Sequence, residues 1–345
     1  MRVVVQLAPA EESTWPQLSA ASYLSPARLV CKAILLAGLA VGLQLAIFML
    51  PPPDHLDYLD SSLDKQALLA GPEKDRVLFA GGSNVAFGVD SYGVEKAADR
   101  YAINLGLHAE LGLRYMMKEV QSGAKAGDLV VLSPEYEHFF GTLANSDVTA
   151  LQLLQDNHDA WRYFTSWGQL VNLARNIGNY NLRKGRSLLT AAARRIARRG
   201  ASSRRVDAET AGLYSRSSFN DRGDMVKHLD EPQPNSWRDP ITRINEPLDP
   251  HLFKEIDQMA ALLESRGVGF CIVYPAVAQS WWRMNGDKVG VIADRLKGFA
   301  ANTPESSVYD DGYFFDTYYH LNRPGRDIRT KELSAIVKSG CHPIS

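Results

Sequence analysis

The sequence is short of cysteine and of net charge, and each shortage excludes a class of protein. Its three cysteines, Cys31, Cys271 and Cys341, form no CxxC pair and have no histidines at zinc-ligand spacing, so we expect neither a zinc site nor a disulfide framework. Cys271 lies in an apolar run, which favours a small core residue. The 38 Lys and Arg nearly balance 39 Asp and Glu, which gives the whole chain no electrostatic attraction to nucleic acid. No glycine-rich nucleotide motif is present, and we expect no nucleic-acid partner, metal or cofactor.

One long apolar run is present near the N-terminus. Residues 33–50 contain Gln44 as their only polar side chain, and a helix of this length spans about 27 Å, enough to cross a bilayer. Arg28 and Lys32 precede the run, whereas several aspartates follow it, so the positive-inside rule predicts a cytoplasmic segment at 1–28. A cleaved signal peptide is the alternative, but the run is longer than a usual signal core and no Ala-x-Ala-like site follows. We therefore predict a retained anchor over 29–50.

Beyond the anchor, residues 54–75 are polar and are interpreted as a neck, and residues 76–345 as the main domain. In this domain short apolar strands alternate with helical patterns, which predicts a parallel sheet covered by helices on both faces. The ligand site of such a sheet lies at the carboxyl ends of its strands. A stretch at about 139–250 interrupts the alternation and is interpreted as a largely helical insertion. We expect strands at 76–80, 101–105, 128–132, 268–274 and 307–309, and helices at 111–122, 252–266, 288–299 and 324–338.

Ser83 has the position of a nucleophile. It follows the first strand within Gly81-Gly82-Ser83-Asn84 and precedes a helical pattern, so its hydroxyl should lie at the carboxyl edge of the sheet, close to helix N-terminal amides. The alternative is that Ser83 only caps that helix.

His320 lies in the segment that leads into the last helix, close to Asp316, and this places it on the same side of the sheet as Ser83. An imidazole there could take the serine proton while a carboxylate orients the ring. We therefore expect Ser83 and His320 to lie within hydrogen-bond reach of each other.

These motifs resemble those of the SGNH (GDSL-like) hydrolase superfamily. Gly-Gly-Ser-Asn follows the first strand, Asn104-Leu105-Gly106 follows the second, and an Asp/His pair precedes the last helix; the resemblance covers roughly 76–135 and 250–340. It implies a three-layer, flavodoxin-like α/β fold in which Ser83 is the nucleophile and Gly106 gives an oxyanion-hole amide. It also implies that His320 and Asp316 complete the catalytic triad.

Two departures from the family pattern leave alternatives open. The family aspartate lies three residues before the histidine, whereas Asp316 lies four before His320, so Asp310 and Asp311 are alternative partners. After the third strand the family has Gly-x-Asn-Asp, but residues 132–138 contain no asparagine. The loss of one oxyanion donor costs about 10²–10³ in rate in serine proteases. Either another group, Asn84 or Tyr136, supplies that donor, or the activity is weak or absent.

Anchored SGNH domains of this kind are similar to proteins that act beside membrane-bound O-acyltransferases on cell-surface polysaccharides. The resemblance implies acyl transfer to or from a sugar hydroxyl, a polysaccharide substrate and a single-pass protein of a bacterial inner membrane, with its domain periplasmic or extracellular. The chain is thus expected to be an O-acyltransferase or carbohydrate esterase. A non-catalytic assembly or glycan-binding protein, or an anchored lipase or thioesterase, is the alternative.

The insertion contains a strongly basic segment. Nine basic and no acidic residues lie between 183 and 205, and the apolar side chains of 188–196 fall on one helical face. Such a helix is typical of a solvated surface or of contact with anionic headgroups or an anionic polysaccharide. A turn at 219–224 and the pair Trp281-Trp282 could contact sugars, but a polar turn and an interfacial aromatic anchor explain them equally well. The residues on the basic face are Arg194, Arg195, Arg198 and Arg199.

Overall fold

The computed structural model describes residues 26–50, 57–198 and 212–343, without the side chains of 191 and 194–198. The chain divides into two compact units, Met1–Ala46 and Ile47–Ser345. Residues 1–25 of the expected cytoplasmic segment therefore lie outside the described residues.

Helix α1 (Pro26–Met49) contains the apolar run. It has a mean hydropathy of 2.1 over its most apolar window, and none of that window is buried. Of the helices in the described ranges, it is the one whose length and composition would let it cross a membrane. The predicted anchor is therefore confirmed to this extent, although a signal sequence would meet the same criterion.

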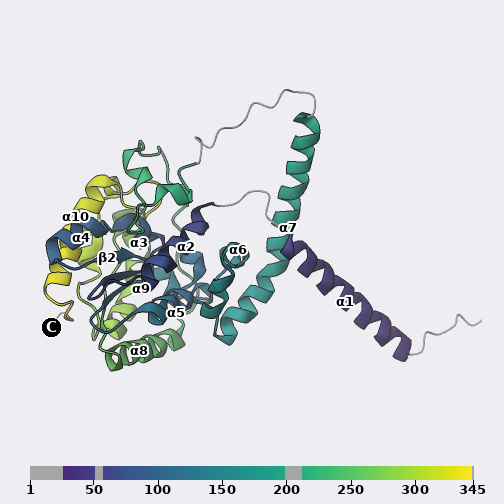
Figure 1. Ribbon diagram of the computed structural model, residues 1–345, viewed down its shortest axis with the longest axis horizontal. Helices are drawn as coiled ribbons and strands as arrows, with labels where there is room; N and C mark the ends of the chain where they lie inside the picture. The colour runs from purple at the N-terminus through teal and green to yellow at the C-terminus, as the bar shows by residue number, and fades with distance from the viewer. Residues whose placement is uncertain (1–25, 51–56, 199–211, 344–345) are drawn as a thin grey trace, which may run out of the picture. The chain divides into compact units, whose positions relative to one another are not determined.

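The second unit is built on a four-stranded parallel sheet (Figure 1). The strands follow the order β2-β1-β3-β4, and Val77 of β1 pairs with Ala102 on one side and with Leu129 on the other. The predicted mixed α/β fold with a parallel sheet is thus confirmed. The strands are β1 (Val77–Gly81), β2 (Ala102–Asn104), β3 (Leu129–Ser133) and β4 (Gly269–Ile272).

Successive side chains of each strand enter two different hydrophobic clusters, as the two-residue period of a strand requires. Val77 and Phe79 pack with residues of α4 and α10, whereas Leu78 and Ala80 pack with residues of α2, α5, α8 and α9. Both faces of the sheet are therefore buried. The helices are α2 (Asp57–Ala70), α4 (Ser91–Ala98), α5 (Leu113–Gly123), α8 (Pro250–Ser265), α9 (Gln279–Leu296) and α10 (Arg323–Lys338).

The expected neck at 54–75 is wrong in its central part, because that part is a helix of the domain. Tyr58 and Leu59 of α2 are buried in the core. Lys65 is also buried, and its ammonium donates to the carbonyls of Asn104 (2.9 Å) and Gly223 (2.5 Å). Burial lowers the pKa of Lys65 to about 7. The hydrophobic pattern did not reveal the helix because polar side chains, Ser61, Ser62 and Lys65, are buried along with its apolar ones.

A second, two-stranded sheet joins β5 (Val277–Ala278) to β6 (Val308–Tyr309). The strand expected at 307–309 is therefore present, but it lies outside the main sheet. Short 3₁₀ turns connect the elements at Ala109–Leu111, Tyr136–Phe139, Leu143–Asn145, His158–Tyr163, Arg216–Ser218, Lys227–Asp230, Glu305–Ser307 and Asp311–Tyr313.

The insertion contains α6 (Val148–Asp156) and the long helix α7 (Trp167–Arg198). It is therefore largely helical in its first half, as expected. Three residues of the basic face, Arg194, Arg195 and Arg198, belong to α7, but their side chains lie outside the described residues, as does all of Arg199. The second half, from 212 to about 249, contains only short turns.

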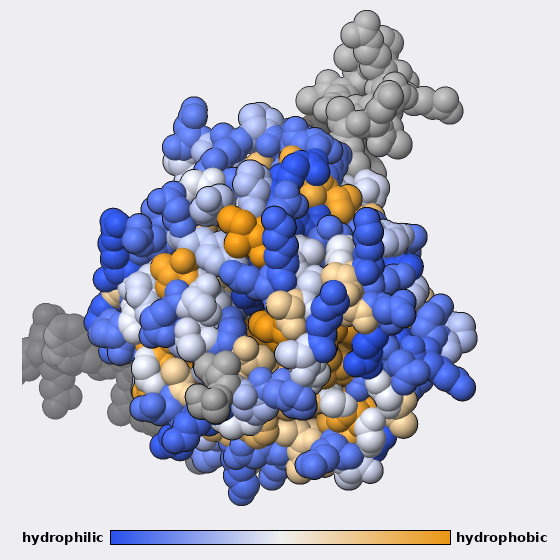
Figure 2. Space-filling view, turned by 90° about the vertical axis from the view of Figure 1, so that its left-hand side faces the viewer, coloured by the Kyte–Doolittle hydropathy of each residue, from blue (hydrophilic) through white to orange (hydrophobic). Residues whose placement is uncertain are grey.

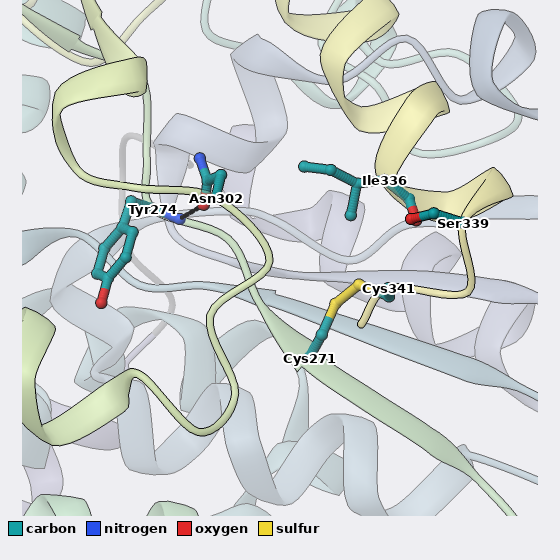
Figure 3. The surroundings of a disulfide bond; sticks show 6 residues. All are labelled: Cys271, Tyr274, Asn302, Ile336, Ser339 and Cys341. Atoms are coloured by element: carbon teal, nitrogen blue, oxygen red, sulfur yellow. Dashed lines mark hydrogen bonds between the residues drawn. A yellow bond between two sulfur atoms is a disulfide. The ribbon is translucent and has the colours of Figure 1, made fainter. Parts of the chain in front are cut away.

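A disulfide joins Cys271 in β4 to Cys341, just after α10 (Figure 3). The expectation of unpaired cysteines is therefore wrong for these two, although Cys271 is also a core residue, with no exposed surface. The two Cα atoms lie 5.9 Å apart across 70 residues of sequence. Cysteine spacing could not reveal this pair, because only the fold brings the end of β4 next to the C-terminal segment.

A chain that begins at Asp54 is expected to be soluble and to fold. It lacks α1 but keeps α2, and the face of the molecule on which α4 and α10 lie is mainly hydrophilic, with scattered small apolar patches (Figure 2). Gel filtration and a cooperative thermal transition would check this. A matched chain that begins at Arg76 loses Tyr58, Leu59 and Lys65 from the core and should unfold or aggregate. Aggregation of the longer chain as well would mean that α1 belongs to the fold.

Candidate active site

The proposed nucleophile lies at the carboxyl edge of the main sheet. Ser83 is the first residue of α3 (Ser83–Gly88), separated from the end of β1 only by Gly82. Gly106 follows β2 and Glu135 follows β3. Because parallel strands end at the same edge, the fold brings these three segments together.

Glu135 accepts the hydrogen bonds at the start of α3. Its Oε1 atom lies 3.1 Å from Ser83 Oγ and 3.0 Å from the backbone nitrogen of Asn84. The side chain is buried, and this burial raises the pKa of Glu135, although the Asn84 amide and His320 partly oppose the shift. The hydroxyl of Ser83 is therefore directed at a buried carboxyl group.

Gly82 is required by this arrangement. A Cβ atom at this position would lie 2.7 Å from Glu135 Oε1 and 3.1 Å from the Cα atom of Ala109. The second glycine of the motif therefore makes room for the carboxyl group beside Ser83.

His320 and Asp316 form a buried pair. Asp316 Oδ1 lies 2.7 Å from His320 Nδ1, and the Tyr214 hydroxyl donates to Oδ2 of the same carboxylate. Burial alone would raise the pKa of Asp316, but the bonds from His320 and Tyr214 outweigh it and lower that pKa below its usual value. The four-residue spacing thus still lets Asp316 orient the imidazole.

The two alternative aspartates do not face His320. Asp310 accepts from the Gly312 amide at 2.9 Å, and Asp311 accepts from the Ser280 amide at 2.9 Å. Asp310 therefore serves a local turn, and Asp311 binds the first turn of α9.

The His320 ring stacks on Phe87, with ring centroids 3.8 Å apart and planes at 5°. Phe87 lies four residues after Ser83 in α3, so the two side chains share one side of the helix. This packing brings the imidazole to the side of α3 on which Ser83 lies. No hydrogen bond links Ser83 to His320 in the described chain, and the expected bond is replaced by the one to Glu135.

The expected oxyanion donors are engaged within the protein. The Gly106 amide donates to Asn104 Oδ1 (2.9 Å), and a Cβ at Gly106 would lie 2.5 Å from the Ala86 nitrogen, so close packing alone requires glycine there. The Asn84 amide donates to Glu135, and its side-chain nitrogen donates to the Ser133 carbonyl (3.0 Å). Their oxyanion roles remain predictions.

Tyr136, the other alternative donor, belongs to the core. Its ring stacks on Trp281 with centroids 5.2 Å apart, and its buried hydroxyl has no hydrogen-bond partner among the described residues. Trp281 is itself fully buried and donates to Glu137 at 2.9 Å. Trp281 can therefore neither contact a sugar nor serve as an interfacial anchor, and both interpretations are wrong for this residue.

The turn at 219–224 is a structural connection. Buried Asp224 accepts from the Ser91 hydroxyl (2.7 Å) and from the Asn104 side chain (3.0 Å), and the Arg222 carbonyl accepts from the Asn104 amide (2.9 Å). The polar-turn interpretation is thus the one that the structure supports.

Sequence reasoning missed two residues of the site. Glu135 lies in the segment where the resemblance predicted an asparagine. The missing asparagine was the only feature of the sequence that could have pointed to it. Tyr214 comes from the insertion and had no signal. In the parts of the chain that the structure describes, no group of three His, Cys, Asp or Glu is arranged to hold a metal.

No protein-family model matches this chain, and neither a curated protein nor a solved structure matches it.

Proposed function

We propose that this protein carries out serine-dependent O-acyl transfer or ester hydrolysis on an exported polysaccharide. Ser83 is the nucleophile, and His320, oriented by Asp316, moves protons of hydroxyl groups at the site. One observation carries the proposal, the buried Asp316–His320 pair stacked on the helix that begins with Ser83. Such a pair beside a serine is the arrangement that nucleophilic catalysis uses.

We further propose that the domain is a three-layer SGNH-type fold. The strand order β2-β1-β3-β4 supports this, as do the burial of both sheet faces and the Ser83 and His320 segments beside α3. In open α/β sheets the ligand lies at this edge of the strands.

The domain is proposed to lie on the outer side of a bacterial inner membrane, anchored by α1. The Cys271–Cys341 disulfide supports export, because disulfides persist in oxidising compartments and are rare in the cytosol. Acidic residues after the run and basic ones before it favour the same orientation. The polysaccharide substrate and a membrane-bound O-acyltransferase as partner follow from the family resemblance.

Covalent labelling tests the nucleophile. The full-length protein in detergent is treated with a fluorophosphonate, and the labelled peptide is identified by mass spectrometry. We expect the label on Ser83. Labelling elsewhere, or none, would contradict the proposed function.

A non-catalytic glycan-binding or assembly protein is the second candidate. The specific observation in its favour is that the groups expected to react or to bind an oxyanion are already hydrogen-bonded within the protein. Glu135 accepts from the Ser83 hydroxyl and the Asn84 amide. The Ser133 carbonyl accepts from the Asn84 side chain, and the Asn104 side chain accepts from the Gly106 amide. An unreactive Ser83 combined with measurable binding of an acidic polysaccharide would favour this candidate.

The basic face formed by Arg194, Arg195, Arg198 and Arg199 is expected to bind anionic surfaces. The protein that begins at Asp54 should bind anionic liposomes or an acidic polysaccharide at low salt, and weakly at physiological salt, where the Debye length is about 8 Å. Changing the four arginines of this face together to glutamine keeps helix propensity nearly level and should remove most of the binding. Equal binding by both proteins would assign these arginines to solubility.

A further inference from the structure

We propose that Glu135 is the base that takes the Ser83 proton, and that the resulting carboxylic acid then serves as the oxyanion donor that the missing asparagine would have supplied. This inference rests on the proposed function, because it assigns a role at the same site. It gives Glu135 a direct catalytic part and leaves His320 to activate the acceptor hydroxyl.

The first argument is the direction of the serine proton. A serine hydroxyl carries one hydrogen and can donate one hydrogen bond at a time. Ser83 Oγ lies 3.1 Å from Glu135 Oε1, which is within the reach required of a general base. No such bond to His320 is present among the described residues, so Glu135 is the group placed to accept this proton.

The second argument is the surroundings of the carboxyl group. Glu135 is 4% exposed, and it takes part in no ion pair with a lysine or arginine of the described chain. A buried carboxylate without a paired cation is a stronger base than one in water, because burial disfavours its charge. The raised pKa of Glu135 agrees with this.

The third argument is the placement of the carboxyl group relative to the amide. Glu135 Oε1 accepts from both Ser83 Oγ and the Asn84 amide, which is the amide next to the nucleophile. When Glu135 is ionised, its negative charge therefore lies beside the amide that would otherwise stabilise an oxyanion. The reaction must therefore remove that charge as the oxyanion forms, since two negative charges in one buried site repel each other.

Proton transfer to Glu135 meets this requirement. Ser83 Oγ forms a bond to the acyl carbon, its O–H bond breaks, the proton passes to Glu135, and the carbonyl electron pair moves to the carbonyl oxygen. Glu135 is now neutral and can donate its O–H to the oxyanion. A neutral carboxyl is also a weaker acceptor than a carboxylate, so the Asn84 amide can leave Glu135 and donate to the oxyanion instead. When the carbonyl re-forms, the bond to the leaving oxygen breaks and that oxygen takes the proton held by the imidazolium of His320, so Glu135 remains neutral in the acyl-enzyme.

His320 then acts on the acyl-serine. The acceptor, water or a sugar hydroxyl, loses its proton to His320 Nε2 as its oxygen bonds the acyl carbon. Asp316 and Tyr214 stabilise the imidazolium through the pair already described. Neutral Glu135 donates to this second oxyanion as well. Its collapse releases Ser83 Oγ, which takes its proton back from Glu135, while His320 keeps the proton of the acceptor.

The test compares rates of Ser83 phosphonylation by a fluorophosphonate in the full-length protein in detergent. Glu135→Gln keeps an oxygen for the Asn84 amide and adds a side-chain N–H donor, but it cannot take the proton. We expect labelling to slow by at least about 10²-fold, the contribution of a general base. Glu137→Gln changes a neighbouring buried carboxyl that does not contact Ser83, and it should label at the wild-type rate. His320→Gln should label nearly as fast as wild type but release acyl groups slowly.

The outcomes separate this proposal from the proposed function. If the wild-type protein labels on Ser83 and Glu135→Gln labels equally fast or faster, the role of Glu135 is overturned. Ser83 would then still be the nucleophile. Wild-type protein that does not label at all would overturn both. Thermal melting checks that each variant folds. If Glu135→Gln does not fold, Glu135→Asp carries the test: the shorter carboxylate should label slowly, and labelling at the wild-type rate would overturn the proposal.

Discussion

Replacing Ser83 by alanine is expected to lower turnover of a small acetyl ester by at least about 10³-fold, because loss of a nucleophile removes the covalent route altogether. The fold should be unaffected, since Ser83 is only partly buried and its hydroxyl makes one hydrogen bond, to Glu135. Ester hydrolysis by the full-length protein in detergent, together with its thermal melting curve, measures both effects.

The matched control is Ser306→Ala. Ser306 is exposed, and its hydroxyl donates to the Thr303 carbonyl at 2.8 Å in a turn outside the site. This variant should hydrolyse the ester at the wild-type rate. Turnover by Ser83→Ala that equals that of the control would remove Ser83 from the mechanism.

Changing Cys271 and Cys341 together to serine is expected to lower the free energy of unfolding by about 4 kcal/mol. The bridge closes a loop of 70 residues, and the chain-entropy account gives roughly this stabilisation for a loop of that length. Urea unfolding of the protein that begins at Asp54 measures the change, as a lower midpoint together with a somewhat steeper slope, because the unfolded chain without the bridge is less compact.

Thiol counting is the companion measurement. The denatured full-length protein should show one reactive thiol before reduction, that of Cys31, and three after it. Cys31→Ser in the full-length protein is the control, because it should show no reactive thiol before reduction and two after it. Three reactive thiols in protein purified without reductant would mean that the bridge does not form in the cell.

The parallel sheet could be predicted from the sequence because each of its strands is a compact apolar run. Val77–Gly81 and Leu129–Ser133 are buried along their whole length, and such strands are recognised by composition alone. Helix α2 could not be predicted in the same way, since it buries polar Lys65 by hydrogen bonds to carbonyls that are distant in the sequence. Burial of that kind leaves no hydrophobic pattern.

The site was predictable only in part, for a related reason. Ser83 and His320 were found because the residues around them form local motifs at strand and helix ends. Tyr214 and Glu135 were missed because their roles come from contacts across the fold: Tyr214 lies 102 residues before Asp316, and Glu135 lies 52 residues after Ser83. The Cys271–Cys341 pair escaped for the same reason.

The tie between β2 and the turn at 219–224 has a consequence for the order of folding. The backbone amide of Asn104 in β2 donates a hydrogen bond to the Arg222 carbonyl. Strand β3 pairs with β1 on one edge and with β4, which begins at Gly269, on the other. During synthesis at about 5–20 residues per second, the first three strands therefore emerge many seconds before the segments that complete them. Until then β3 presents an open strand edge, which is a template for pairing with other chains. In a nascent chain β4 can join the sheet only after Gly269 has been synthesised, so the sheet is completed late.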